Sequence, residues 1–220
     1  MWNFERGLAK VVGMMLHREL KAGVRAVYLE GKFPPPPFVL AMNHHSYFDG
    51  HLVYLLFRSF GFRGKLLISP ENVAAFPIFR PLGALEASRV RAALQALGAG
   101  EVVAVFPEGD LRCHGKLGEL KRGAVFLAQK ARVPLVPCAA RLFPRGFPRP
   151  EIYIWIGDPV DPDLGALRVA LERMLSAMDE LVEKTHPREP IPGFHPLFTG
   201  HRGLDEQMAG ISRALGRFLR

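Results

Sequence analysis

The stretch that decides the fold of this chain reads Phe38-Val39-Leu40-Ala41-Met42-Asn43-His44-His45-Ser46-Tyr47-Phe48-Asp49-Gly50. Its first five residues form the uninterrupted apolar run that is typical of a buried β-strand. An apolar helical pattern begins near His51. The polar residues between these two segments therefore lie at a strand-to-helix junction, where α/β sheets usually present their reactive groups.

His44 and Asp49 are the candidate reactive pair of this junction. An imidazole changes its protonation near neutral pH and can act as a general base, and a carboxylate on its second ring nitrogen would fix its tautomer and orientation. The spacing alone is weak evidence, because chance gives such a pair in roughly one chain of four with this composition. The context has to support the prediction.

Outward from this stretch, strand-like and helix-like segments alternate along the chain. We expect strands at 24–29, 38–42, 65–69, 102–106, 135–140 and 152–156, and helices at 51–60, 90–97, 117–131 and 164–184. Such alternation predicts an α/β fold with a mostly parallel central sheet flanked by helices. Residues 23–184 would make up this domain.

Two further segments flank the predicted domain. Residues 1–22 contain an amphipathic helix at 2–20, with Trp2 and Phe4 near its start. It is suited both to a membrane interface and to packing on its own domain. Residues 185–220 are predicted to form an irregular, Pro- and Gly-rich segment and a C-terminal helix at 204–219, packed on the domain.

The composition of the chain indicates its cellular compartment and the kind of partner that it binds. The 220 residues carry a formal net charge of +8, which favours an anionic partner such as nucleic acid, a membrane surface or a phosphorylated ligand. The two cysteines, Cys113 and Cys138, do not form a disulfide framework, which favours a reducing compartment. Charges at Glu5, Arg6 and Lys10 interrupt any signal-peptide pattern, so we expect a cytoplasmic protein.

Three more blocks accompany the first. Phe106-Pro107-Glu108-Gly109 follows the expected strand at 102–106, Gly83–Arg89 places Arg89 at a helix start, and Val133-Pro134-Leu135-Val136-Pro137 frames a strand. The two strand ends could bring His44 and Glu108 to one cleft. A guanidinium at a helix N-terminus is suited to a phosphate.

Taken in chain order, at 43–50, 83–89, 106–109 and 133–137, these four blocks resemble the motifs of the glycerolipid acyltransferase family, the PlsC-type 1-acylglycerol-3-phosphate acyltransferases. The resemblance covers residues 24–160. It implies transfer of a fatty acyl group from acyl-CoA or acyl carrier protein to a lipid hydroxyl, as in phospholipid biosynthesis. The thioester would be a co-substrate, with no metal and no other cofactor. His44 would be the general base and Asp49 its orienting group. The residues expected to bind substrate are Ser46, Arg89, Glu108, Gly109, Arg112 and Lys121.

The same reading places the protein on the inner face of the cell membrane as a peripheral enzyme. The basic excess suits an anionic lipid surface, and an acyl carrier protein is a possible further partner. Nucleic acid is discounted, because the chain lacks aromatic–basic interleaving and a helix-turn-helix signal.

Departures from the family pattern leave alternatives open. Asp110-Leu111-Arg112 stands where the family has Thr-Arg-Ser, which places an anion near the presumed phosphate site. The acceptor could therefore be a non-phosphate lipid, such as a glycolipid or a glycosylated terpenoid. Two alternatives of another class are a catalytically inactive membrane-binding protein and a metal-dependent hydrolase that uses His44, His45, Asp49 and His51.

Overall fold

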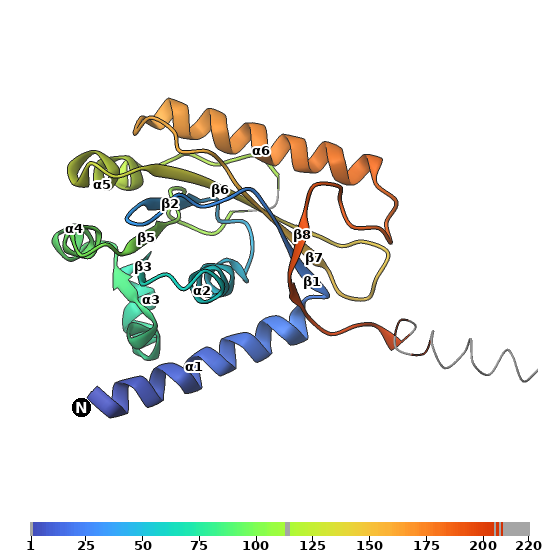
Figure 1. Cartoon of the computed structure of the whole chain (residues 1–220), viewed down its shortest axis with the longest axis horizontal. Helices are drawn as coiled ribbons and strands as arrows, with labels where there is room; N and C mark the ends of the chain where they lie inside the picture. The colour runs from blue at the N-terminus through green and yellow to red at the C-terminus, as the bar shows by residue number, and fades with distance from the viewer. Residues whose placement is uncertain (1, 113–114, 205, 207, 209–220) are drawn as a thin grey trace, which may run out of the picture.

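A mixed β-sheet forms the centre of the computed structural model, which describes residues 2–112, 115–204, 206 and 208 (Figure 1). Within these residues the sheet has eight strands, in the order β4-β3-β5-β2-β6-β7-β1-β8. In chain order the strands are β1 (Ala26–Glu30), β2 (Val39–Met42), β3 (Gly64–Ile68), β4 (Ala84–Glu86), β5 (Val102–Val105), β6 (Leu135–Phe143), β7 (Glu151–Ile156) and β8 (His195–Thr199).

Strand direction confirms the predicted α/β class. β4, β3, β5, β2 and β6 are all parallel to their neighbours within that group, β7 runs antiparallel to β6, and β8 runs antiparallel to β1. β1 and β7 are parallel to each other. The carboxyl ends of β2, β3, β4 and β5 therefore share one edge of the sheet, which is where parallel sheets place their sites.

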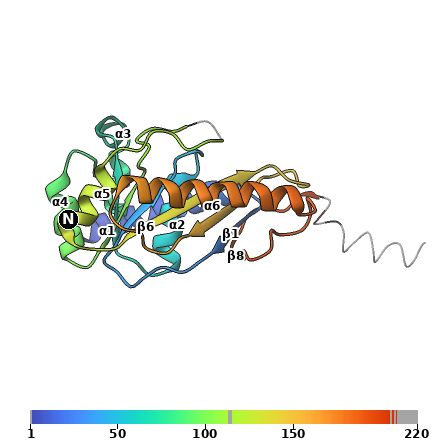
Figure 2. The same ribbon diagram turned by 90° about the horizontal axis from the view of Figure 1, so that it is seen from above.

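Helices cover both faces of the sheet (Figures 1 and 2). The helical segments are α1 (Trp2–Gly23), α2 (Asp49–Ser59), α3 (Pro70–Ala75), η1 (Pro77–Leu82), α4 (Val90–Gly98), α5 (Gly123–Ala131) and α6 (Leu164–Lys184). Buried side chains of α4, α5 and α6 form the core on one face, and those of α1 and α2 contribute to the core on the other. Because β2 and β5 lie between these two layers, all of their residues are buried, which explains their unbroken apolar sequence.

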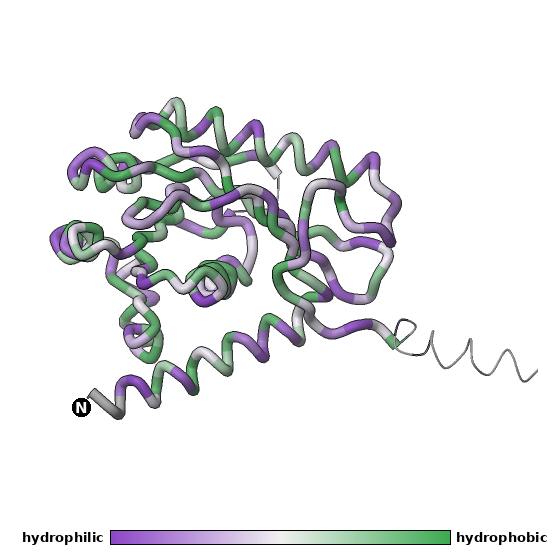
Figure 3. The backbone as a smooth tube through the Cα atoms, in the orientation of Figure 1, coloured by the Kyte–Doolittle hydropathy of each residue, from purple (hydrophilic) through white to green (hydrophobic). Residues whose placement is uncertain are grey.

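The N-terminal helix packs on the domain and also exposes apolar side chains. Val12 and Leu20 of α1 are buried, whereas Met14 and Met15 are more than half exposed. In Figure 3 hydrophobic and hydrophilic bands alternate along this helix. Packing of α1 on its own domain is thereby confirmed, and contact with a membrane stays a prediction. Among the described residues, no helix has the length and apolar character needed to cross a bilayer.

Glycine allows α1 to approach α2 closely. A Cβ atom at Gly13 would lie 2.0 Å from the hydroxyl oxygen of Tyr54, and one at Gly23 would lie 2.3 Å from the ring of Phe48. Both distances are far below van der Waals contact, so a larger residue at either position would force the aromatic side chain that it meets to move.

Several predicted boundaries were wrong. The helix expected at 117–131 begins only at Gly123, because the backbone N–H groups of Gly118 and Lys121 are hydrogen-bonded to the Glu108 side chain and the Pro107 carbonyl. Strand β4 was not expected, and the segment at 185–201, predicted to be irregular, contains β8. The helix predicted at 204–219 lies outside the described residues, apart from 204, 206 and 208, which are helical. The side chains of Trp2 and Phe4, and the residues Cys113 and His114, also lie outside them.

Candidate active site

His44 lies just beyond the carboxyl end of β2, and its ring is held from two sides. Its Nδ1 is 2.9 Å from Oδ2 of Asp49, the first residue of α2. One face of the ring stacks on Phe106, which follows β5, with a centroid distance of 4.3 Å and an interplanar angle of 14°. The expected contact between imidazole and carboxylate is present. Because a carboxylate accepts hydrogen bonds, the tautomer of the neutral ring that fits this contact has its proton on Nδ1 and a lone pair on Nε2.

The carboxylate of Asp49 also fixes the turn that carries His44. Its Oδ2 accepts hydrogen bonds from the backbone N–H groups of His45 and Ser46, each at 2.9 Å. The Ser46 hydroxyl accepts from the N–H of Phe48 at 3.1 Å. Asp49 is 1% exposed and lies in the first turn of α2, where the helix dipole favours a negative charge. Asp49 thus stabilises both the loop and the ring, and Ser46 stabilises the loop.

Glu108 binds the same loop from the opposite side. Its Oε2 accepts the backbone N–H of His44 at 2.8 Å, and its Oε1 accepts from Gly118 N at 2.8 Å and lies 3.2 Å from Nε2 of His45. Burial by itself raises the pKa of Glu108, but the hydrogen bonds from His45, His44 and Gly118 outweigh it and hold the pKa below its usual value. Glu108 was predicted to contact substrate. Its side chain is fully buried and bonded to the two loops in this structure, and a contact with substrate stays a prediction.

Sequence patterns missed the side chains behind Glu108. Arg141 of β6 is buried, and its guanidinium contacts the ring of His45 and the carboxylate of Asp179 on α6. Asn43 is also buried, and its side-chain amide pairs with the backbone of Ala140 through two hydrogen bonds. The sequence signal that could have pointed to this cluster is an arginine between the apolar run 135–140 and the apolar pair Leu142-Phe143.

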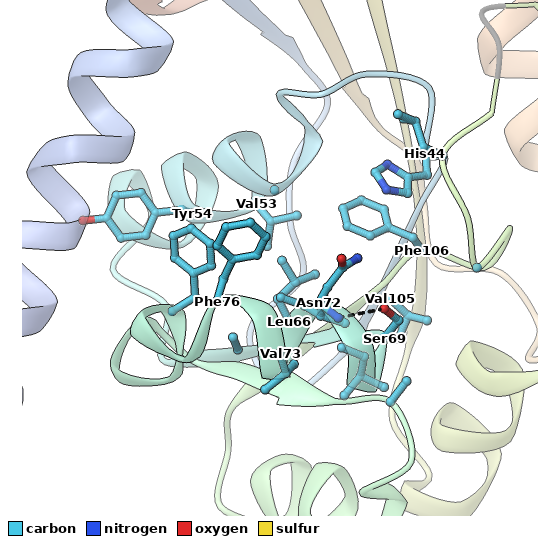
Figure 4. Close-up of a pocket in the computed structure, with 18 of the residues that line it drawn as sticks. His44, Val53, Tyr54, Leu66, Ser69, Asn72, Val73, Phe76, Val105 and Phe106 are labelled. Carbon is cyan, nitrogen blue, oxygen red and sulfur yellow. Dashed lines mark hydrogen bonds between the residues drawn. The ribbon is translucent and has the colours of Figure 1, made fainter.

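A pocket of about 900 Å³ opens beside His44 (Figure 4). This volume is near the upper end of the range of roughly 300–1,000 Å³ that is common for small-molecule sites. Its wall is mostly apolar. In Figure 4 His44 and Phe106 lie together, and the aliphatic and aromatic side chains line the space beyond them. Residues of the apolar wall include Leu16, Val53, Tyr54, Phe57, Leu66, Val73, Phe76, Phe79, Leu82 and Val105.

The predicted cationic residues do not all converge on this pocket. Lys121 is the one lysine or arginine among the described residues of the pocket lining, and its Nζ lies 3.6 Å from Oδ2 of Asp110, which also lines the pocket. Gly109 lies beneath the Lys121 side chain and adopts φ of +79°, where a Cβ atom would meet Nζ at 2.3 Å. Arg112 and Arg89 are exposed and lie outside the described lining.

His44, His45 and the nearby His51 contact different partners. His44 faces Asp49, His45 faces Glu108 and Arg141, and Nε2 of His51 lies 3.1 Å from Glu19 of α1. In the part of the chain that the structure describes, no three His, Cys, Asp or Glu side chains are grouped as metal ligands would be. The geometry therefore does not support the metal-dependent alternative at these four residues.

Comparison with known proteins identifies relatives along most of the chain. Residues 25–141 match the family model described as acyltransferase. The 1-acyl-sn-glycerol-3-phosphate acyltransferase of Bacillus subtilis is 28% identical over 178 residues, which cover 75% of this chain and 87% of that protein. The alpha form of this enzyme from sheep (Ovis aries) is 33% identical over 137 residues, which cover 56% of this chain and 47% of the sheep protein.

A solved structure shares the fold. The crystal structure of the 1-acyl-sn-glycerophosphate acyltransferase PlsC from Thermotoga maritima superposes with a TM-score of 0.57. The match covers 82% of this chain and 80% of that one at 24% sequence identity, a level at which the likeness concerns the fold alone.

Proposed function

Because the chain belongs to the acyltransferase family, we propose that it transfers a fatty acyl group from an acyl thioester to the free hydroxyl of a lysophosphatidate-type glycerolipid. The observation that supports this proposal most strongly is the position of His44. An imidazole oriented by a carboxylate stands at the polar end of a large apolar pocket, so a reactive group and space for a hydrocarbon chain adjoin each other.

His44 is the proposed general base. An alcohol attacks a thioester efficiently only if its proton is removed as the new bond forms, and Nε2 of His44 accepts this proton. Asp49 stabilises the imidazolium through Nδ1–H, as the acid does in a Ser-His-Asp triad. The C–O bond forms and the C–S bond breaks, and the imidazolium returns the proton to the departing thiolate. The nucleophile is the acceptor hydroxyl itself, so no acyl-enzyme is required.

The apolar pocket is the proposed site of the acyl chain. Each methylene that leaves water for this wall contributes about 0.8 kcal/mol, so a chain that fills the pocket binds more tightly than a short one. The thioester carbonyl would then lie beside His44 and Phe106. Acyl-CoA and acyl carrier protein both supply such a thioester.

The relatives support a phosphate on the acceptor, because they are 1-acyl-sn-glycerol-3-phosphate acyltransferases. Lys121 is the cation best placed to meet it, and the predicted contribution of Arg89 and Arg112 would require these exposed side chains to move. Asp110 favours the second candidate, a non-phosphate acceptor, because it already neutralises Lys121. A panel of lysophosphatidate, a neutral lysolipid and a glycolipid, each assayed with acyl-CoA, separates the two acceptor classes.

Membrane contact is proposed through the outer face of α1 and the rim of the pocket. Val11, Met14 and Met15 on the helix and Tyr47, Phe76 and Leu111 near the pocket are large apolar residues with at least half of their surface exposed. A basic protein with such a face suits an anionic bilayer, at the inner surface of the cell membrane as a peripheral enzyme. Liposome flotation with and without residues 1–22 tests this: unchanged binding would exclude α1 as the contact.

Replacement of His44 by alanine tests the chemistry. We expect kcat to fall by about 10²–10⁴-fold, the range typical of a lost general base, with little change in thermal stability because the ring is 23% exposed and borders the pocket. Acyl transfer is measured with acyl-CoA and lysophosphatidate. His51→Ala changes a histidine of α2 that lines the same pocket but contacts Glu19, and it serves as the control. Full activity of the His44 variant would refute the proposal.

A further inference from the structure

Arg141 is a buried cation that belongs to none of the four sequence blocks. It is 3% exposed and uses all three guanidinium nitrogens. Nη1 donates to Nδ1 of His45 at 2.7 Å, Nη2 donates to the carbonyl of Gly115 at 2.7 Å, and Nε and Nη2 each donate to the carboxylate of Asp179 at 2.9 Å. One side chain therefore connects the loop of His44, the loop after β5 and helix α6.

The guanidinium determines which tautomer His45 adopts. Arginine has donors and no acceptor, so the nitrogen of His45 that it contacts must accept. The ring proton of neutral His45 is then on Nε2, which donates to Oε1 of Glu108 at 3.2 Å. With Glu108 satisfied in this way, its second oxygen accepts the backbone N–H of His44 at 2.8 Å. The hydrogen bonds run without a break from α6 to the residue beside the pocket.

We propose that Arg141 is a positioning residue for acyl transfer: through His45 and Glu108 it fixes the backbone from which His44 projects. This inference rests on the proposed role of His44 as the general base. Arg141 touches neither the pocket lining nor the ring of His44, and among its bonded partners His45 is the one that belongs to the loop of His44.

Loss of the guanidinium would release the ring of His45. Nδ1 would have no donor, and the ring could turn its unprotonated nitrogen toward the carboxylate of Glu108, which is a repulsive arrangement in a buried site. The carboxylate of Glu108 would then lack its hydrogen bond from His45 and would no longer be held in place to accept the N–H of His44. A base displaced by about 1 Å loses on the order of 10²-fold in rate, because proton transfer depends on the alignment of both partners.

Arg145 provides a matched control. Its side chain is 2% exposed, as is that of Arg141, and it also bonds a carboxylate. Its partners include Glu151, Tyr153 and the backbone carbonyl of His186, and none of them contacts the loop of His44. For Arg141→Met we expect kcat per folded molecule to fall about 10²-fold, with KM for both substrates within about threefold. For Arg145→Met we expect kcat within about twofold of the wild type. Equal losses of kcat in the two variants would overturn the proposal.

A double-mutant cycle tests whether Arg141 acts through His45. His45→Gln alone should reduce kcat, and the combination with Arg141→Met should be no worse than the more impaired single variant, because both interrupt one path. Independent, multiplicative losses would contradict the inference. His44→Ala, assayed in parallel, separates a failure of the proposed function from a failure of the positioning role. If His44→Ala stays active, the proposed function fails. If His44→Ala is inactive and Arg141→Met is fully active, only the positioning role of Arg141 fails.

A spectroscopic readout on the unmodified protein does not depend on whether Arg141→Met folds. In the ¹⁵N spectrum of histidine-labelled wild-type protein, assigned by difference from His45→Gln, we expect His45 at pH 7 as the neutral tautomer with its proton on Nε2. A proton on Nδ1, or a doubly protonated ring, would refute the proposal even if Arg141→Met failed to fold.

Discussion

Glu108 and Glu151 are both buried carboxylates, at 0% and 1% exposure, but they bind different kinds of partner. Glu108 accepts from two backbone N–H groups and one imidazole, all in the loops beside the pocket. Glu151, the first residue of β7, accepts from the side chains of Arg25, Tyr28, Arg145 and Tyr153. The first carboxylate fixes the path of a loop, and the second joins side chains around the strands.

This contrast separates a carboxylate that positions a loop of the active site from one that stabilises the fold. A carboxylate bound by backbone amides determines where the next side chain points, so its loss should affect the reaction. A carboxylate bound by guanidinium and phenol groups neutralises buried charge, so its loss should affect folding. The burial and the charge are the same in both cases.

Activity should show the largest difference between the two carboxylates. In Glu108→Gln the new NH₂ group faces one of three donors, which disturbs the loop, and we expect kcat/KM to fall about 10²-fold. Glu151→Gln should keep kcat/KM per folded molecule within about twofold. Steady-state acyl transfer at pH 7, corrected for the folded fraction, measures both. If the two variants lost activity equally, the distinction between the carboxylates would be wrong.

Stability should show the opposite order. Glu151→Gln leaves the buried guanidinium of Arg145 without a countercharge, and we expect the free energy of unfolding to fall by about 3 kcal/mol. Urea denaturation at pH 7 measures this value. Glu180→Gln, which removes an exposed i,i+4 partner of Lys184 on α6, is the control and should unfold like the wild type. A loss for Glu151→Gln no greater than that of the control would contradict the prediction.

Acid should weaken the fold through Glu108. Its folded-state pKa lies below the ordinary value of 4.5, so its ionised form stabilises the native state above that pH, and this contribution disappears as the pH falls through the folded-state pKa. The free energy of unfolding of the wild type should therefore fall more steeply below about pH 4.5 than that of Glu108→Gln, which has no such group. Identical slopes would indicate that the pKa of Glu108 is the same in the folded and unfolded states, which would contradict the prediction.

Removal of the exposed ion pair between Asp110 and Lys121 should have the smallest effect on acyl transfer. The side chains of Asp110 and Lys121 are 69% and 65% exposed, so solvent screens their attraction. Asp110→Asn frees Lys121, and we expect KM for lysophosphatidate to fall about threefold while a neutral acceptor is unaffected. Asp161→Asn makes the same change in net charge elsewhere. An equal fall of KM in that variant would assign the effect to overall charge.

The sequence predicted the part of the site that is local. His44 and Asp49 lie within one turn between a strand and a helix, so the spacing and the apolar runs were sufficient to place them together. Arg141 is 96 residues from His45, and its contact depends on how β6 lies against β2. No periodicity in a single sequence encodes such a pairing, and the same holds for Asp179 on α6.

The missed strands have local causes. β4 has only three residues and includes Glu86, too short a segment for an alternating pattern. β8 contains Pro196, which argues against a strand in a sequence but is tolerated at the edge of a sheet, where β8 lies next to β1. The apolar runs of β2, β5 and β6 were found because burial on both faces leaves little freedom in their composition.

Helix α1 alone separates one side of the pocket from the solvent. Leu16 and Glu19 on its inner side line the pocket, while Met14 on its outer side is 55% exposed. An α-helix with its side chains is only about 10 Å across, so the same rigid rod is both the inner wall of the pocket and part of the molecular surface. Any force that tilts α1 from outside must change the shape of the space inside. The closest approaches of α1 to the rest of this wall are at Gly13, which faces Tyr54 of α2, and at Gly23, which faces Phe48 just before α2.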